Sequence, residues 1–195
     1  MSGRIVVTEF MGIDGVIQDP GGTGEYDRGG WSFEYDRGDE GNKFKFDELM
    51  AADAQLFGRI TYEGFAEAWP GREDDPAMAD YAKRINSMPK YVVSTTLKDP
   101  GWENATVISD NVPEEVAKLK DQYEGDILIA GSAALIKTLV ENDLVDEWRL
   151  MVFPTIIGDG KKLFDGVVPR RKLKLRDDKP LGPDGIRLLT YERAG

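Results

Sequence analysis

Residues 126–139 of this 195-residue chain read DILIAGSAALIKTL, and they indicate its fold more strongly than any other stretch. The apolar run Ile127, Leu128 and Ile129 is typical of a strand buried in a parallel sheet. A glycine, Gly131, follows almost at once, and apolar side chains then recur at helical spacing. We therefore predict a buried strand that leads through a glycine turn into a helix.

The start of that helix is a candidate anion site, because free N–H groups and the helix dipole both favour negative charge there. Gly131 allows a ligand to approach the backbone closely, and Ser132 is a favourable N-cap residue. The same residues also fit a plain tight turn that binds nothing. This stretch alone does not decide between the two interpretations.

Composition limits the chemistry that is available. A hydrophobic fraction of 41% supplies a core for one domain spanning residues 1–195. The net charge of −11 argues against nucleic-acid and anionic-membrane partners, but a small anionic ligand can still bind at a locally positive site. Cysteine and histidine are absent, which excludes disulfides, zinc–thiolate sites and Ser–His triads. Any general acid must be Asp, Glu, Lys, Tyr or water.

The N-terminus shows no signal-peptide pattern, and no apolar run is long enough to span a bilayer. We expect a cytoplasmic protein with a small-molecule partner and no bound metal.

A second junction of a strand with a glycine and a helix follows the short strand at 55–57. Here Gly58 precedes Arg59, which can bind a phosphate bidentately, and Thr61, which adds a hydroxyl donor. Alternatively, Arg59 is a solvated surface residue. The strand at 91–94 ends at Ser94 and Thr95, which either contact a ribose phosphate or cap a turn.

The first strand, at 4–11, ends in the turn GIDG at residues 12–15. Asp14 therefore lies near the carboxyl ends of the strands, where α/β proteins bind their ligands, although an Asp-Gly pair also forms simple turns. Residues 18–42 form a long Gly- and acid-rich loop before a helix at 43–52. In this loop Trp31 either covers a flat ligand or anchors the loop to the core.

The last part of the chain has a different pattern. Segments 146–153, 171–177 and 186–192 read as strands with no helix between them, and such strands pair antiparallel. The predicted fold is therefore α/β, with a mixed, mostly parallel sheet and antiparallel C-terminal strands.

Several motifs, taken in order, resemble the dihydrofolate reductase superfamily. They are GIDG at 12–15, GRITYE at 58–63, VVSTTL at 92–97 and AGSA at 130–133. The later motifs LVDE at 144–147, FP at 153–154 and IGDG at 157–160 resemble the reductase domain of bifunctional riboflavin biosynthesis enzymes, here without the deaminase domain. The resemblance covers about residues 3 to 192 and implies a three-layer α/β/α fold that binds NADPH.

The resemblance also implies roles for individual residues. Arg59, with Ser94 and Thr95, would face the 2′-phosphate of the cofactor. The pyrophosphate would lie against Gly58, Thr61, Gly131, Ser132, Ala133 and Ala134. The backbone near Thr8 and Ile13 would face the nicotinamide. The substrate would lie beside Asp14, Gly15 and Trp31, with Asp14 as the candidate catalytic acid.

Two features depart from the family pattern. Ala130-Gly131 replaces a Gly-Gly pair, which leaves open whether the turn adopts the family's backbone geometry. The helix before Gly58 shows no clear match to the buried acid of dihydrofolate reductase, although Asp47 and Glu48 lie there.

We expect a homodimeric, NADPH-dependent reductase of a small heterocycle, such as a pterin or a ribosylaminouracil phosphate, or of a carbonyl compound. The alternative is a protein that retains the fold and binds a nucleotide or another ligand without catalysis.

Overall fold

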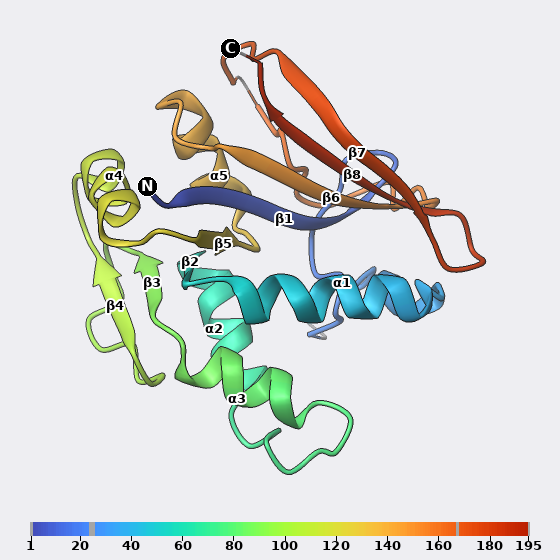
Figure 1. Cartoon of the computed structure of the whole chain (residues 1–195), viewed down its shortest axis with the longest axis horizontal. Helices are drawn as coiled ribbons and strands as arrows, with labels where there is room; N and C mark the ends of the chain where they lie inside the picture. Colours follow the sequence, from blue (N-terminus) through green and yellow to red (C-terminus); the bar gives the residue numbers. More distant parts are fainter. Residues whose placement is uncertain (1, 24–25, 167, 195) are drawn as a thin grey trace.

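The computed structural model of the chain describes residues 2–23, 26–166 and 168–194, and it is built around an eight-stranded sheet (Figure 1). Across the sheet the strands follow the order β4-β3-β2-β5-β1-β6-β8-β7. The strands are β1 (Arg4–Gly12), β2 (Ala54–Gly58), β3 (Lys90–Val93), β4 (Ala105–Ile108), β5 (Asp126–Ile129), β6 (Glu147–Phe153), β7 (Leu173–Leu181) and β8 (Ile186–Arg193). The helices are the short 3-10 helix η1 (Trp31–Glu34), α1 (Gly38–Ala51), α2 (Arg59–Ala68), α3 (Ala79–Ser87), α4 (Val112–Gln122) and α5 (Ala133–Glu141).

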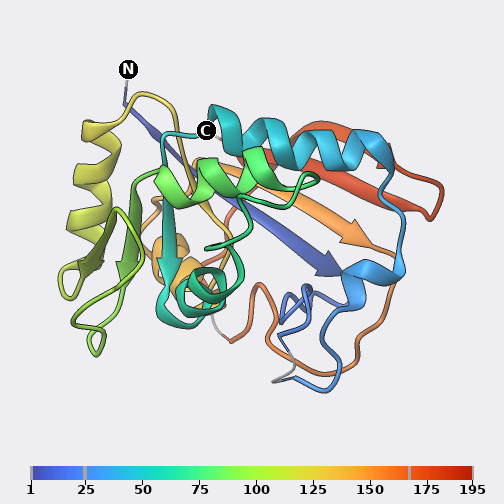
Figure 2. The same cartoon turned by 90° about the horizontal axis from the view of Figure 1, so that it is seen from below.

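The helices form two layers, one on each face of the sheet, as predicted. Leu49 of α1, Tyr62 of α2 and Ile85 of α3 share one buried cluster on the first face. On the second face, Val116 of α4 and Leu135 of α5 belong to another cluster. Figure 2 shows α1 and α3 lying side by side across the first face. The three-layer α/β/α architecture follows from this arrangement.

The strand directions confirm the predicted mixed sheet. In this order the strands from β4 to β6 run parallel to one another, whereas β8 runs antiparallel to both β6 and β7. The edge strand β7 has a register shift between Leu175 and Asp177 and contains Pro180, which has no N–H to donate. Bulges, prolines and charged side chains all discourage pairing along a sheet edge. These features disfavour pairing of another strand along the edge of β7.

The segment 18–42 is more ordered than a plain loop, although its residues 24 and 25 lie outside the described residues. Helix α1 begins at Gly38, five residues before the predicted start at 43. Trp31 is only 4% exposed; its indole N–H donates to the Gln18 carbonyl at 3.0 Å, and its ring meets Phe153 edge-on at 5.3 Å. Of the two alternatives for Trp31, the geometry supports the one that anchors this segment to the core.

Across the described part of the chain, no helix combines the length and the apolar character that crossing a membrane requires.

Candidate functional site

The two glycine junctions found in the sequence lie in contact with each other. The Gly58 N–H donates to the Gly131 carbonyl at 3.3 Å. A Cβ atom on Gly58 would overlap the Ser132 hydroxyl, and one on Gly131 would lie 2.8 Å from Thr61 Oγ1. Both positions therefore require glycine, because the backbone of one junction packs against the side chains of the other.

This contact brings the N-termini of two helices together. Helix α2 starts at Arg59 directly after Gly58, and α5 starts at Ala133 after its N-cap residue Ser132. Since Ile136 donates to the Ser132 carbonyl at 3.0 Å, the amides before Ile136 precede the first helical hydrogen bond of α5. Two positive dipole ends and several free N–H groups thus converge on one spot, which suits a pyrophosphate.

The backbone of the second junction has an unusual conformation. Gly131 has φ +101°, in the region that side chains other than glycine rarely adopt, and the Gly131–Ser132 peptide is cis.

Arg59 and Ser94 follow neighbouring strands, because Gly58 of β2 is in register with Val93 of β3. Arg59 is largely exposed and pairs with Glu63 one helical turn later, at 2.8 Å. The buried Ser94 hydroxyl accepts the Leu97 N–H at 2.9 Å and so caps a turn, whereas Thr95 is exposed. Arg59 therefore lies beside the carboxyl end of β3, and its surface ion pair with Glu63 can give way to an ion pair with a more strongly charged anion, such as a phosphate.

A gap opens in the sheet beside β1. The pairing of β1 with β5 ends at Val7 and Ile129, where the chain turns toward α5, but β1 continues to Gly12 along β6. The part of this edge that begins at Thr8 therefore faces the space in front of the two glycine junctions, and it ends at Gly12, whose N–H donates to the Val16 carbonyl at 2.9 Å. Such an edge can hydrogen-bond a flat amide-bearing ring.

Asp14 and Gly15 lie on the rim of this opening. The Asp14 carboxylate accepts the Gly158 N–H at 2.7 Å and the Val16 N–H at 3.4 Å, which ties the first turn to the segment 155–163. Partial burial raises the pKa of Asp14, but these N–H groups outweigh it, so the net pKa lies below the usual value. Ile13 on the same turn is 60% exposed, and a Cβ added to Gly15 would have nothing within 4 Å.

A buried group of charged side chains lies beneath the opening, between α1 and the sheet. Thr8 and Arg149 are cross-strand neighbours, and Glu48 of α1 lies over them. One carboxylate oxygen of Glu48 accepts the Thr8 hydroxyl at 2.9 Å and also contacts the Lys45 ammonium. The other is 3.6 Å from Arg149 Nη1 and accepts no hydrogen bond from the described residues. This buried oxygen is thus paired with Arg149 by charge but accepts no hydrogen bond, an arrangement that is costly in the protein interior.

Phe10 follows Thr8 on the same face of β1, closer to the opening. The Lys45 ammonium and the Arg37 guanidinium each lie 5.3 Å from the centre of its ring. The partly buried surface beside Glu48 is thus aromatic and positively charged. It suits a flat, polar molecule that carries negative charge or electron-rich oxygens.

Glu9 is a second buried acid on the same stretch of β1. It is 6% exposed, lies opposite Leu150 of β6, and points to the α5 side because successive side chains of a strand alternate. Its Oε1 has no hydrogen-bond partner among the described residues. Burial raises the pKa of Glu9 to about 8, against the opposing effect of the Lys45 charge. Glu9 is therefore mostly protonated at neutral pH.

Sequence reasoning did not single out Glu9, Lys45 or Arg149, and it left Glu48 unassigned. The sequence nevertheless carried a signal for Glu9 and for Arg149. A glutamate within the buried run at 4–11, and an arginine on a strand covered by helices, must each be buried and need a partner. The partners themselves come from distant parts of the chain.

This chain is similar to a known protein family and to proteins of known sequence. The model of the RibD C-terminal domain family matches residues 4–186. The chain is 35% identical over 188 residues to "Uncharacterized protein YyaP" of Bacillus subtilis (strain 168), covering 96% of this chain and 94% of the relative.

Two solved structures share the fold. A protein from Shewanella sp. PV-4, provisionally assigned to riboflavin biosynthesis, superposes with a TM-score of 0.75 at 21% identity, covering 100% of both chains. Dihydrofolate reductase from Enterococcus faecalis, complexed with NADP(H) and RAB-propyl, gives a TM-score of 0.62 at 18% identity, covering 98% of this chain and 97% of the other.

Proposed function

Since the chain belongs to the RibD C-terminal domain family, we propose that it is a reductase that uses NADPH to reduce a small heterocyclic or carbonyl compound. The observation that carries this proposal is the contact between the Gly58 and Gly131 junctions. This contact brings two helix N-termini to one place, where the glycines let a ligand approach the backbone closely. The dihydrofolate reductase of E. faecalis, which shares the fold, is complexed with NADP(H).

In this proposal the residues of the two junctions bind the cofactor phosphates. The amides of Ala133 and Ala134, together with the Thr61 hydroxyl, donate to the pyrophosphate. Arg59 leaves Glu63 and pairs with the 2′-phosphate, with Thr95 and the Ser94 turn beside it. The edge of β1 that begins at Thr8 faces the nicotinamide, and Ile13 follows its end with its N–H already donated to the Thr155 carbonyl at 3.0 Å. When bound, the cofactor supplies the hydride.

The substrate then occupies the opening between Phe10 and Asp14. The Glu48 oxygen that accepts no hydrogen bond favours a ring with N–H donors, and Lys45 and Arg37 favour carbonyl oxygens or a phosphate. These preferences fit a pterin or a ribosylaminouracil phosphate. We assign Asp14 to orienting the substrate, since a carboxyl group with a lowered pKa is ionised at neutral pH.

The alternative is a protein that binds the cofactor or another ligand without turning it over. The lowered pKa of Asp14 favours it, because an ionised Asp14 does not donate a proton at neutral pH and a reductase would have to take that proton from an acid of the helix at 43–52 or from ordered water. The two candidates separate in one assay. With a pterin or a ribosylaminouracil phosphate present, a reductase oxidises NADPH and the absorbance at 340 nm falls. A binding protein leaves this absorbance unchanged.

The cofactor site is tested by Gly131→Ala, with Gly71→Ala as its matched control. Both glycines have positive φ, but a Cβ on Gly71 has nothing within 4 Å, whereas one on Gly131 meets Thr61. We expect Gly131→Ala to weaken NADPH binding in calorimetry by about tenfold or more, because charge-assisted hydrogen bonds to the phosphates are lost. Gly71→Ala should bind as the wild type does. Equal NADPH affinity in both variants would contradict the assignment.

A further inference from the structure

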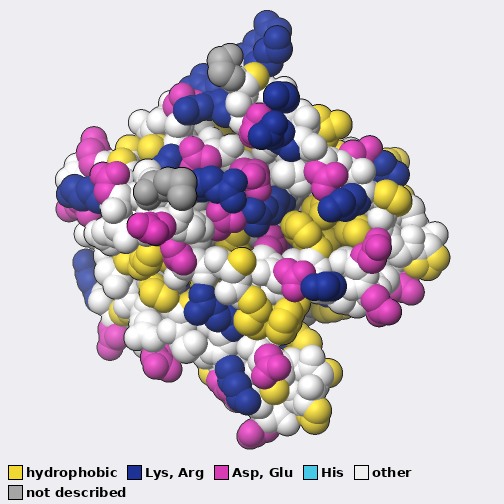
Figure 3. Space-filling view, viewed as in Figure 1, with side chains coloured by type: hydrophobic (Ala, Val, Ile, Leu, Met, Phe, Trp, Pro, Cys, Tyr) yellow, Lys and Arg dark blue, Asp and Glu magenta, His cyan; other side chains and the backbone are white. Residues whose placement is uncertain are grey.

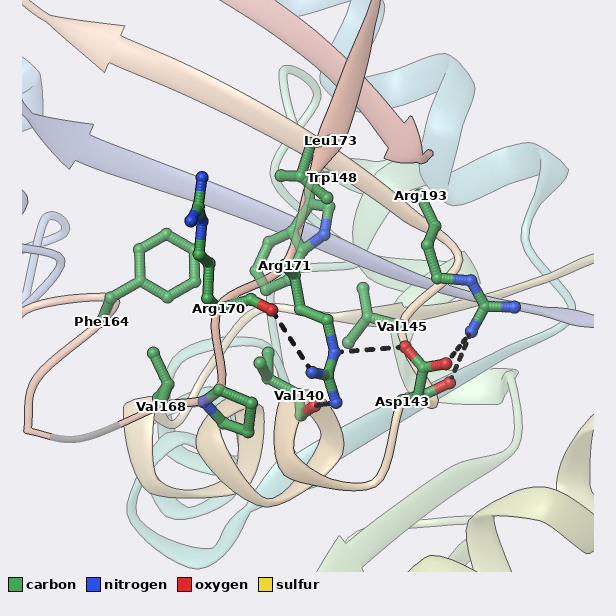
Figure 4. Close-up of a pocket in the computed structure, with 11 residues that line it drawn as sticks. Val140, Asp143, Val145, Trp148, Phe164, Val168, Arg170, Arg171, Leu173 and Arg193 are labelled. Carbon is green, nitrogen blue, oxygen red and sulfur yellow. Dashed lines mark hydrogen bonds and ion pairs between the residues drawn. The ribbon is translucent and has the colours of Figure 1, made fainter. Parts of the chain in front are cut away.

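A separate pocket of about 290 Å³ lies beyond the C-terminal end of α5, between that helix and the starts of β6 and β7 (Figure 4). The proposed phosphate site is at the opposite end of the same helix. With nine residues at a rise of about 1.5 Å each, α5 separates the two by roughly 13 Å. None of the residues that line the pocket is one of those assigned to the cofactor, so the cofactor proposed above does not account for it.

The walls of the pocket are mainly apolar. Trp148 forms its floor with its side chain 4% exposed, and the Phe164 ring stands 5.3 Å away at the mouth, where it is 46% exposed. Valine side chains from α5 and from the loop before β7 close the remaining sides, as Figure 4 shows. Its volume is at the lower end of the range for ligand pockets, so only a small molecule fits.

The rim of the pocket is positively charged. Three arginines line it together with one acid, Asp143, which gives a formal charge of about +2. Two of them, Arg171 and Arg193, converge on Asp143 at 3.4 and 2.7 Å. Arg170 instead extends beside the Phe164 ring, away from Asp143, and makes no ion pair with any described residue (Figure 4).

This local charge is opposite to that of the whole protein. The segment 170–176 reads RRKLKLR, with five basic residues and no acid, in a chain of net charge −11. In Figure 3 Lys and Arg side chains gather at the top of the molecule, where Figure 1 shows that β7 begins and β8 ends. A cation beside an apolar hollow attracts a ligand that has an anionic group and an apolar body.

We propose that this pocket binds a small amphipathic organic anion, with its apolar part against Trp148 and Phe164 and its carboxylate, sulfonate or phosphate on Arg170. The apolar part removes the exposed Phe164 ring from water. The anionic group gives Arg170 the partner that it lacks within the described chain. Arg171 and Arg193 keep their structural contact with Asp143 and add to the positive field.

Octanoate is the probe for this site, with octan-1-ol as the neutral molecule of the same length. Binding is measured by calorimetry and by the shift of the Trp148 indole N–H signal in NMR, which Trp148→Phe identifies. We expect octanoate to bind, to move that signal, and to bind about tenfold or more tightly than octan-1-ol, because a charge-assisted contact is worth that ratio.

Three variants locate the binding. Arg170→Gln and Phe164→Ala should each weaken octanoate binding by about tenfold. The matched control is Arg176→Gln, which removes the same charge from the same basic segment but lies outside the pocket. It should leave the affinity unchanged. The proposal is overturned if octanoate fails to bind, if it leaves the Trp148 signal unmoved, or if Arg176→Gln weakens it as much as Arg170→Gln.

Discussion

Replacing Glu9 by glutamine should change how the stability of the protein depends on pH. The buried carboxyl group has its pKa raised from 4.5 to about 8. Between these two values the unfolded chain releases the Glu9 proton while the folded protein retains it. Stability therefore falls as pH rises through this window, and the fall is complete above about pH 8.

The size of the effect follows from the linkage relation. With pKa values of 4.5 and about 8, the wild type loses about 1 kcal/mol by pH 5 and about 3 kcal/mol by pH 7. Glutamine does not titrate, so Glu9→Gln lacks this loss. The new amide also adds a cost for its unpaired N–H groups, but that cost is the same at every pH.

The assay is urea unfolding of the wild type and Glu9→Gln at pH 5 and pH 7. The free energy of unfolding of the variant minus that of the wild type should grow by roughly 2 kcal/mol between these two values. Glu9→Met should show the same growth, and Glu67→Gln, which replaces an exposed acid of α2, should show almost none. A difference that stays constant from pH 5 to pH 7 for both Glu9 variants would refute the reasoning.

Other expected outcomes concern the proposed reaction. Asp14→Asn should raise KM more than it lowers kcat, because it removes a positioning contact; a loss of kcat by about 10²-fold with unchanged KM would instead make Asp14 the proton donor. Glu48→Gln should weaken substrate binding by about tenfold while leaving the NADPH affinity unchanged, since Glu48 is assigned to the substrate and not to the cofactor phosphates; unchanged substrate binding would remove Glu48 from the site. Activity should survive EDTA, and a loss restored by a divalent ion would contradict this expectation. Light scattering should give twice the 21.7 kDa chain mass if the expected homodimer forms, and a monomer at high concentration would dismiss it.

The sequence predicted the local parts of this fold well, because the necessary information lies within short stretches. The run at 126–139 contains its own strand, turn and helix, and α5 begins at Ala133 as that pattern requires. The alternation in the last third likewise predicted antiparallel strands. It did not predict that β8 lies between β6 and β7, since strand order depends on which distant faces pack together.

The same distinction between local sequence information and long-range contacts applies to the candidate site. Gly58, Thr61 and Gly131 were recognisable one junction at a time from their place between a strand and a helix. Their mutual contact was not, because more than seventy residues separate Gly58 from Gly131. The pairing of Glu48 with Arg149 was hidden for the same reason. Trp31 could equally cover a ligand or fill the core, and only the position of Phe153 distinguishes these roles.

The central claim, that this is an NADPH site, is tested most directly by the dissociation constants of NADPH and NADH for the wild type and for Arg59→Ala. The wild type should prefer NADPH by about tenfold to a hundredfold, because a charge-assisted pair is worth about 1.5–3 kcal/mol. Arg59→Ala should lose that preference while its affinity for NADH stays unchanged, and Arg72→Ala, an arginine beside Trp69 outside the site, should keep it. Equal affinities of the wild type for the two cofactors, or no binding of either, would contradict the account.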